Sequence, residues 1–263
     1  ASDSPERIQA DQGYISGLYN TGLVGAVVNS GSMAGLTNSG TLTSLANSGM
    51  LSYLINNSIA GSISNTGTLS NLSNVGSIAG LSNNGTLTSL NNSGTMSGVV
   101  QAGGIMTGLT NSGLITAAGT AVGVTGGTLA SLTNTGSIIG SGMGVVVSAG
   151  ASLTGLNNLG YISGLVNAGA VSSLVNNSVV GSISNTGTLS SLSNVGSMAG
   201  LSNNGLLTSL NNSGTMSSLI QAGGIMSGVT NSGLITASGT AVGVTSGTLS
   251  SLTNTGSIIG SGM

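Results

Sequence analysis

The chain of 263 residues has no cysteine, histidine, tryptophan or phenylalanine, and its one proline and all its charged residues lie in the first eleven positions. Without His or Cys, the sequence cannot supply the Ser-His or Cys-His pair that activates a nucleophile. Asp3, Glu6 and Asp11 are too few and too terminal for a carboxylate pair or a calcium cage. We therefore expect no enzyme, no metal site and no cofactor.

The shortage of charge also limits the partners. From Gln12 to Met263 no side chain carries a formal charge, and Arg7 is the only cation. A nucleic-acid surface needs several Lys or Arg residues to neutralise phosphates, so we expect no nucleic-acid partner. A membrane-spanning helix needs roughly 20 consecutive apolar residues. Apolar runs such as GVVV at 144–147 are much shorter, so we expect no membrane span.

The composition favours a folded chain over a disordered one. Disordered segments are poor in apolar residues and usually rich in charge. Here 38% of the residues are hydrophobic, the mean hydropathy is +0.46, and the apolar residues are regularly spaced. The missing cysteines leave export open, since a long repeat protein needs no disulfides.

A nine-residue repeat, N-x-G-x-[L/I/M]-x-x-[L/V/I]-x, fills most of the sequence. The unit GTLTSL at 40–45 shows its physical logic: alternation places Leu42 on one face and its Thr neighbours on the other. The second leucine, Leu45, follows three positions later, so the chain must bend between them. We expect Asn38 and Gly40 to form a corner, because both residue types tolerate a positive φ.

One such unit buries almost nothing, whereas stacked units bury a continuous apolar column. The pattern predicts an all-β, right-handed parallel β-helix (β-solenoid) with about 18–24 residues per rung. Stacked corners bring the asparagines into a ladder of amide hydrogen bonds, and the alternative is that Asn is only a good turn residue. The predicted ladder residues are Asn20, Asn29, Asn38, Asn47, Asn56, Asn65, Asn74, Asn83, Asn92, Gln101, Asn158, Asn167, Asn176, Asn185, Asn194, Asn203, Asn212 and Gln221.

A longer period of 120 residues lies on top of the nine. Residues 61–143 match 181–263 at 72 of 83 positions, and the duplicated blocks extend over 34–143 and 154–263. We expect 1–13 to be an N-terminal leader or cap and 14–263 one continuous solenoid. If two units form a rung, residue n pairs with n+18, and about twelve rungs give a rod of about 60 Å. The alternative, three units per rung, predicts pairing with n+27.

The stretch NSGTLTSLANSGM at 38–50 and the block NTGSIIGSGMGVVVSAGASLTGLNNLG at 134–160 resemble the passenger region of bacterial autotransporter adhesins and related haemagglutinin-like exoproteins. The resemblance covers nearly all of the chain after about residue 14. It implies a parallel β-helix that is displayed on, or shed from, the outer surface of a Gram-negative cell. The sequence lacks a protease triad, so the resemblance assigns no autoprocessing.

Our leading hypothesis is therefore a secreted or surface-displayed adhesin rod that promotes self-association, cell aggregation or biofilm. Near-zero charge promotes association, so the expected partner is another copy, with host or neighbouring-cell glycans or proteins as further partners. The alternative is a filament subunit that stacks end to end, since the last rung, SIIGSGM, stops within the pattern. Carbohydrate binding and ice binding are minor alternatives. The Thr-Leu-Thr triplets at 41–43 and 86–88 are the motif for ice binding, and Tyr14, Tyr19, Tyr53 and Tyr161 are candidate ligand contacts.

Overall fold

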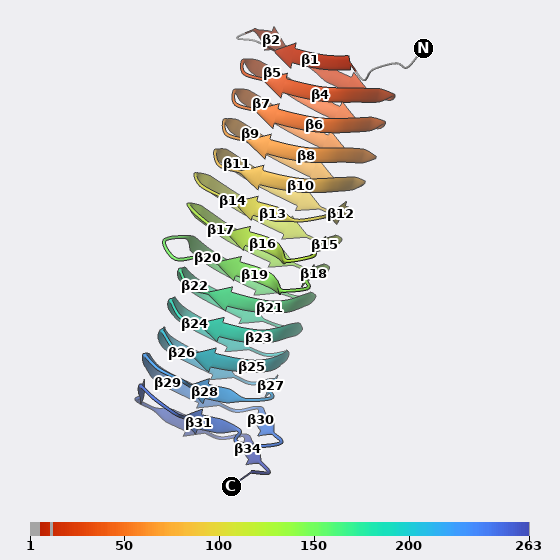
Figure 1. Ribbon diagram of the computed structural model, residues 1–263. Coiled ribbons are helices and arrows are strands. Elements are labelled where there is room, and N and C mark those ends of the chain that lie inside the picture. The colour runs from red at the N-terminus through yellow and green to blue at the C-terminus, as the bar shows by residue number, and fades with distance from the viewer. Residues whose placement is uncertain (1–5, 11–12, 263) are drawn as a thin grey trace.

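Most nine-residue units form one strand of seven residues and a two-residue corner. Thr41–Asn47, for example, is a strand, and Ser48 and Gly49 turn the chain into the next strand, Met50–Asn56. The computed structural model describes residues 6–10 and 13–262. This part of the chain is a β-solenoid of about twelve turns, here called rungs, and it contains no helix (Figure 1).

Successive units alternate between two parallel sheets, so that each rung contributes to both. The first sheet has 19 strands, because several of its rungs are split into two short strands. They are β1 (Glu6–Ala10), β4 (Leu23–Asn29), β6 (Thr41–Asn47), β8 (Ile59–Asn65), β10 (Ser77–Asn83), β12 (Thr95–Met96), β13 (Val99–Gln101), β15 (Leu114–Ala117), β16 (Thr120–Val124), β18 (Ser137–Gly140), β19 (Met143–Val147), β21 (Tyr161–Asn167), β23 (Val179–Asn185), β25 (Ser197–Asn203), β27 (Thr215–Met216), β28 (Leu219–Gln221), β30 (Leu234–Ala237), β31 (Val242–Val244) and β34 (Ser257–Gly260).

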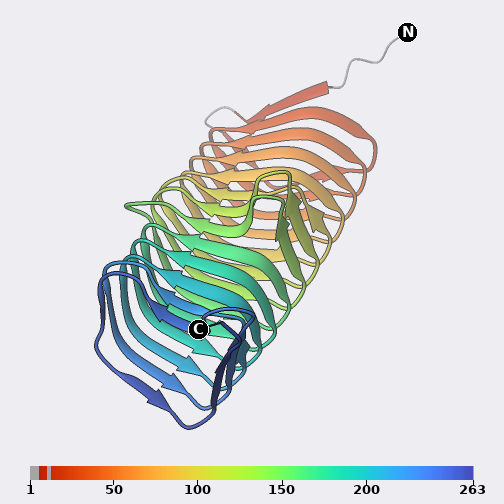
Figure 2. The same ribbon diagram turned by 60° about the horizontal axis from the view of Figure 1, so that its bottom comes forward.

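The second sheet has 15 strands and lies opposite the first across the core. They are β2 (Tyr14–Ile15), β3 (Leu18–Asn20), β5 (Ser32–Asn38), β7 (Met50–Asn56), β9 (Thr68–Asn74), β11 (Thr86–Asn92), β14 (Ile105–Asn111), β17 (Thr128–Asn134), β20 (Ser152–Asn158), β22 (Ala170–Asn176), β24 (Thr188–Asn194), β26 (Leu206–Asn212), β29 (Ile225–Asn231), β32 (Thr248–Leu249) and β33 (Leu252–Asn254). Figure 2 shows the flattened outline of the coil, with irregular yellow-green loops standing out from it.

The register confirms that two units form a rung. Asn29 of β4 pairs with Asn47 of β6, which pairs with Asn65 of β8, a spacing of 18 residues. The longer stretches close wider rungs, as the spacing predicts. In the second sheet, Asn111 pairs with Asn134 at 23 residues, and Asn134 pairs with Asn158 at 24.

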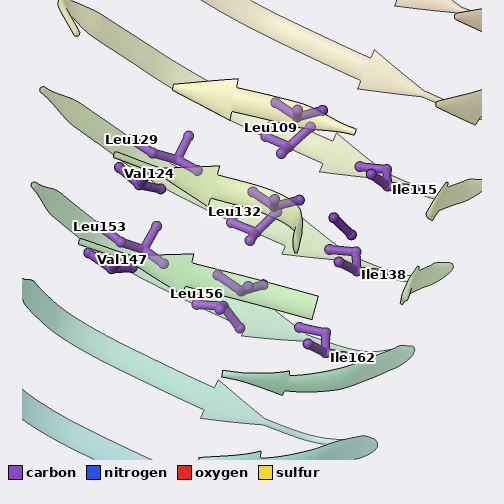
Figure 3. Packing of buried hydrophobic residues seen from close by; sticks show 14 of the residues in the cluster. Leu109, Ile115, Val124, Leu129, Leu132, Ile138, Val147, Leu153, Leu156 and Ile162 are labelled. Carbon is purple, nitrogen blue, oxygen red and sulfur yellow. The ribbon is translucent and has the colours of Figure 1, made fainter. Parts of the chain in front are cut away.

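The core is a double column of aliphatic side chains between the sheets. Leu42 and Leu45, the pair predicted to face inward, are both buried. The same two positions are buried in nearly all of the remaining units. Figure 3 shows the stacking in the middle of the rod, where Leu129 lies above Leu153 and Leu132 above Leu156. Full burial of one such side chain contributes about 1.5–3 kcal/mol relative to its exposure, so stacking stabilises every rung through its neighbours.

The corner glycines do not adopt the positive φ that was expected of them. Within the described residues, positive φ occurs at Gly98, Gly104, Gly127, Gly150, Gly224 and Gly247, and none of these is the Gly of an N-x-G corner. A Cβ at the corner residue Gly85 would instead lie 2.1 Å from the carbonyl oxygen of Gly67 in the preceding rung. At most corners glycine is favoured because the stacked corners leave little room for a side chain, although Ser58 and Ser178 occupy the same position in two units.

The N-terminal residues contribute a strand. Residues 6–10 form β1, which pairs in parallel with β4, so that Ala10 lies beside Asn29. Residues 1–5 and 11–12, the rest of the predicted leader or cap, lie outside the described residues.

Candidate functional site

The described residues hold no group of three or more His, Cys, Asp or Glu side chains that is placed to bind a metal ion. Across 6–10 and 13–262, no helix is long and apolar enough to cross a membrane. The polar groups that remain for a functional role are the buried corner amides and the outer faces of the two sheets.

The corner residues form two ladders, one at each edge of the flattened coil. The unbroken ladder follows the second sheet, and in it the side-chain Nδ2 of each asparagine donates to Oδ1 of the asparagine one rung on, over 2.7–2.9 Å. Its members are Asn20, Asn38, Asn56, Asn74, Asn92, Asn111, Asn134, Asn158, Asn176, Asn194, Asn212, Asn231 and Asn254.

The interrupted ladder follows the first sheet and has the same geometry in two separate runs. The first run is Asn29, Asn47, Asn65, Asn83 and Gln101, and the second is Asn167, Asn185, Asn203 and Gln221. Between the runs, Val124 and Val147 occupy the corner position, in register with Gln101 above and Asn167 below. Both valines are fully buried, and Figure 3 shows them stacked at the edge of the core.

The amides of each ladder all donate in one direction, which explains the two unpaired oxygen atoms of the interrupted ladder. Every amide donates toward the C-terminal rung, so the first member of a run has no amide before it to donate to its oxygen. Among the described residues, the buried side-chain oxygens without a partner are Oδ1 of Asn29 and Oδ1 of Asn167, and each begins a run. At the start of the unbroken ladder, the backbone N–H of Gly22 donates to Oδ1 of Asn20 over 3.1 Å.

The structure places every asparagine and glutamine of the predicted set in one of these two ladders and adds four asparagines. These are Asn111, Asn134, Asn231 and Asn254. All four begin an N-x-G triplet, but they lie outside the strict nine-residue spacing. The triplet itself was the signal that would have identified them.

The outer faces of both sheets carry mainly Ser, Thr, Asn and Gly side chains with scattered apolar ones, and no charge from residue 13 onward. The two Thr-Leu-Thr triplets lie on opposite faces, Thr41–Thr43 in β6 and Thr86–Thr88 in β11, so they do not form one array. A shallow hollow of about 330 Å³ beside Gly80 and Gly98 recurs 120 residues later beside Gly200 and Ser218. The second hollow is smaller, about 190 Å³, and has a serine at the position of Gly98.

No protein family, no curated protein and no solved structure matches this chain. The resemblance to autotransporter passengers therefore stays a prediction from the residue pattern, whereas the β-solenoid itself is observed.

Proposed function

We propose that the chain is an adhesive structural rod that associates with copies of itself through its flat, uncharged faces. The observation that carries the proposal is the absence of formal charge on both sheets over the whole described length after residue 12. Two such rods have no electrostatic reason to stay apart, and near-zero net charge promotes association. Rows of hydroxyl and amide groups at the rung spacing supply many weak hydrogen bonds between adjacent rods.

The proposed setting is the bacterial cell surface or the extracellular space, where such rods would promote cell aggregation or biofilm. Support for this setting comes from the residue pattern shared with autotransporter passengers and from the absence of cysteine. The proposed role is structural and non-enzymatic, because the sequence holds no His or Cys with which to activate a nucleophile.

Sedimentation analysis of the purified chain over a range of concentrations and salt tests the proposal. Two lysine-bearing variants identify the face that associates. One carries lysine at Ser52, Thr88 and Ser172 on the second sheet, and the other carries it at Thr43, Ala79 and Ala199 on the first; all six positions are exposed. We expect lysines on the associating face to give monomers at low salt and to allow association again at high salt, because salt screens the repulsion.

A chain that stays monomeric at all concentrations contradicts the proposal, and so does association that neither lysine set weakens. Electron microscopy separates lateral association from the alternative of end-to-end stacking. Lateral association gives bundles of short rods, whereas end-to-end stacking gives unbranched fibres one rod thick.

A further inference from the structure

Three of the four tyrosines of the chain lie on the outer face of the second sheet, within its first three rungs. Tyr14 of β2 and Tyr19 of β3 belong to its first rung, and Tyr53 of β7 belongs to its third. Their side chains are 71%, 67% and 40% exposed. We call these three residues the tyrosine patch. The fourth tyrosine, Tyr161, lies on the other sheet, in β21.

The three tyrosines are spread along β5, the strand between the first and third rungs: Tyr14 is in register with Ser32, Tyr53 with Gly35 and Tyr19 with Thr37. The hydroxyl-bearing end of the Tyr53 ring lies over Gly35, where an added Cβ would be 1.9 Å from Cζ of the tyrosine. Tyr19 reaches the same rung from the other side, because the hydroxyl of Ser39 donates to its phenolic oxygen over 3.5 Å.

Two glycines lie in this part of the sheet, and one of them, Gly35, makes room for the Tyr53 ring. Gly17 and Gly35 occupy the outward position of successive rungs, between the column that contains Tyr14 and the column that contains Tyr19. Gly35 is covered by Tyr53, whereas Gly17 is exposed. The patch therefore offers three aromatic side chains and one exposed glycine on the outer face of the sheet, with serine and threonine hydroxyls beside them.

We propose that the tyrosine patch binds a neutral polysaccharide made of β-1,4-linked pyranose rings. A pyranose ring presents C–H groups on its faces, which pack on aromatic rings, and hydroxyls at its edge, which match phenolic and serine hydroxyls. The β-1,4 linkage gives a flat, extended chain, and this shape fits a flat sheet that bears several rings. The absence of charge on the surrounding surface matches a ligand without carboxylate, sulfate or amine groups.

The restriction of the patch to three rungs favours a saccharide over a second copy of the chain. Self-association through repeated Ser, Thr and Asn side chains uses surface that runs the whole length of the rod. The aromatic side chains instead mark one place on one sheet, as a local binding site does. The inference is thus independent of the proposed self-association, and either can fail alone.

Co-sedimentation of the full chain with microcrystalline cellulose and with chitin tests the proposal. We expect wild-type protein to be retained on at least one of them. The change Tyr53→Ala, or the pair Tyr14→Ala and Tyr19→Ala, weakens retention about tenfold, which is typical of losing an aromatic hot-spot residue. Gly35→Ala also weakens retention, because the new Cβ displaces the Tyr53 ring although the tyrosine itself is unchanged.

Tyr161→Ala is the matched control, because Tyr161 is 41% exposed on the first sheet and takes no part in the patch. It leaves retention unchanged. Since the chain has no tryptophan, the change in tyrosine fluorescence on adding a soluble hexasaccharide of whichever polysaccharide retains the chain, cellohexaose or chitohexaose, gives a second readout. Tyr161→Ala preserves this change and the patch variants reduce it. Circular dichroism confirms that each variant keeps its sheet content.

Three results overturn the proposal. The first is a wild-type chain that neither polysaccharide retains, a result that leaves the self-association proposal standing. The second is an equal loss of retention for Tyr161→Ala and Tyr53→Ala, which indicates nonspecific adsorption through any exposed tyrosine. The third is a set of patch variants that lose self-association and keep polysaccharide retention, which identifies a second copy of the chain as the occupant.

Discussion

The two ladders use the same amide geometry but differ in continuity. At one edge of the coil the amides run unbroken from Asn20 to Asn254, while at the other edge Val124 and Val147 separate two runs. The backbone pairing continues across the valines, since Gln101 pairs with Val124 and Val147 with Asn167. A stack of rungs therefore does not require an amide at every corner.

The break has an identifiable cost. The first amide of a run has no amide before it to donate to its oxygen, and a buried acceptor that finds no other donor costs about 1–3 kcal/mol. In the interrupted ladder this occurs at Asn29 and again at Asn167, whereas the unbroken ladder has no such atom. The apolar contacts of the two buried valines offset part of that cost.

The largest expected effect comes from placing a charge inside the unbroken ladder. Asn74 accepts from Asn56 and donates to Asn92, and Asn74→Asp removes the donor and adds a buried carboxylate. We expect a loss of about 3 kcal/mol or more at pH 7. Burial raises the pKa of the new carboxyl above its unfolded value of about 3.9, so the part of the loss that comes from the charge vanishes below about pH 4 and grows as the pH rises. The part that comes from the lost amide donor to Gly76 and Thr95 remains at low pH.

Thermal melting at pH 3 and pH 7, followed by circular dichroism, measures that effect. The wild type is the control, and its melting temperature should change little with pH, because residues 12–263 hold no Asp, Glu, His, Lys or Arg. An equal loss of stability at both pH values would show that the damage comes from altered packing and not from the charge.

A smaller effect compares one amide from each ladder. Asn74→Ala deprives Oδ1 of Asn92 of its donor and so creates a new unpaired buried acceptor, which costs about 1–3 kcal/mol. Asn167→Ala deprives Oδ1 of Asn185 of its donor in the same way, but it also removes Oδ1 of Asn167, which was already unpaired. We expect Asn167→Ala to be the milder change, as judged by urea midpoints. Equal midpoints would mean that the unpaired oxygen of Asn167 costs nothing in the wild type.

The sequence predicts much of the regular part of this fold. The nine-residue spacing and strand alternation predict the inward positions of Leu42 and Leu45, and they limit the pairing to n+18 or n+27; the register decides for n+18. The sequence does not predict which ladder is interrupted. The stretches around Val124 and Val147 lack the N-x-G triplet, so nothing local indicates that their corners stack on Gln101 and Asn167.

The positions of the four tyrosines likewise divide into those that the sequence predicts and one that it does not. Once the rung is known to hold two units, Tyr19 and Tyr53 belong to units two rungs apart and must share a face. Tyr161 cannot be assigned that way, because the stretches of 23 and 24 residues interrupt the alternation between it and the others. Its placement on the first sheet needed the structure. The close approach of stacked corners, which explains residues such as Gly85, is likewise a contact between rungs that no single unit contains.

The smallest expected effect comes from substitutions that join the two runs of the interrupted ladder. Val147→Asn would supply a donor to Oδ1 of Asn167, and Val124→Asn would supply one to the amide oxygen introduced at 147. Each change alone also buries a polar group in place of a valine, so we expect single variants to lose stability. The double variant should recover about 1 kcal/mol relative to the sum of the single changes, because each new amide satisfies the next.

A double-mutant cycle on urea midpoints measures this coupling, and Asn167→Leu provides the control. With Asn167 replaced by leucine, the last acceptor in the row of amides is gone, and the coupling between Val124→Asn and Val147→Asn should shrink. If the coupling persists unchanged in that background, the gain comes from contact between the two introduced side chains alone. The continuity of the unbroken ladder would then reflect pairwise contacts between rungs, with no advantage from its length.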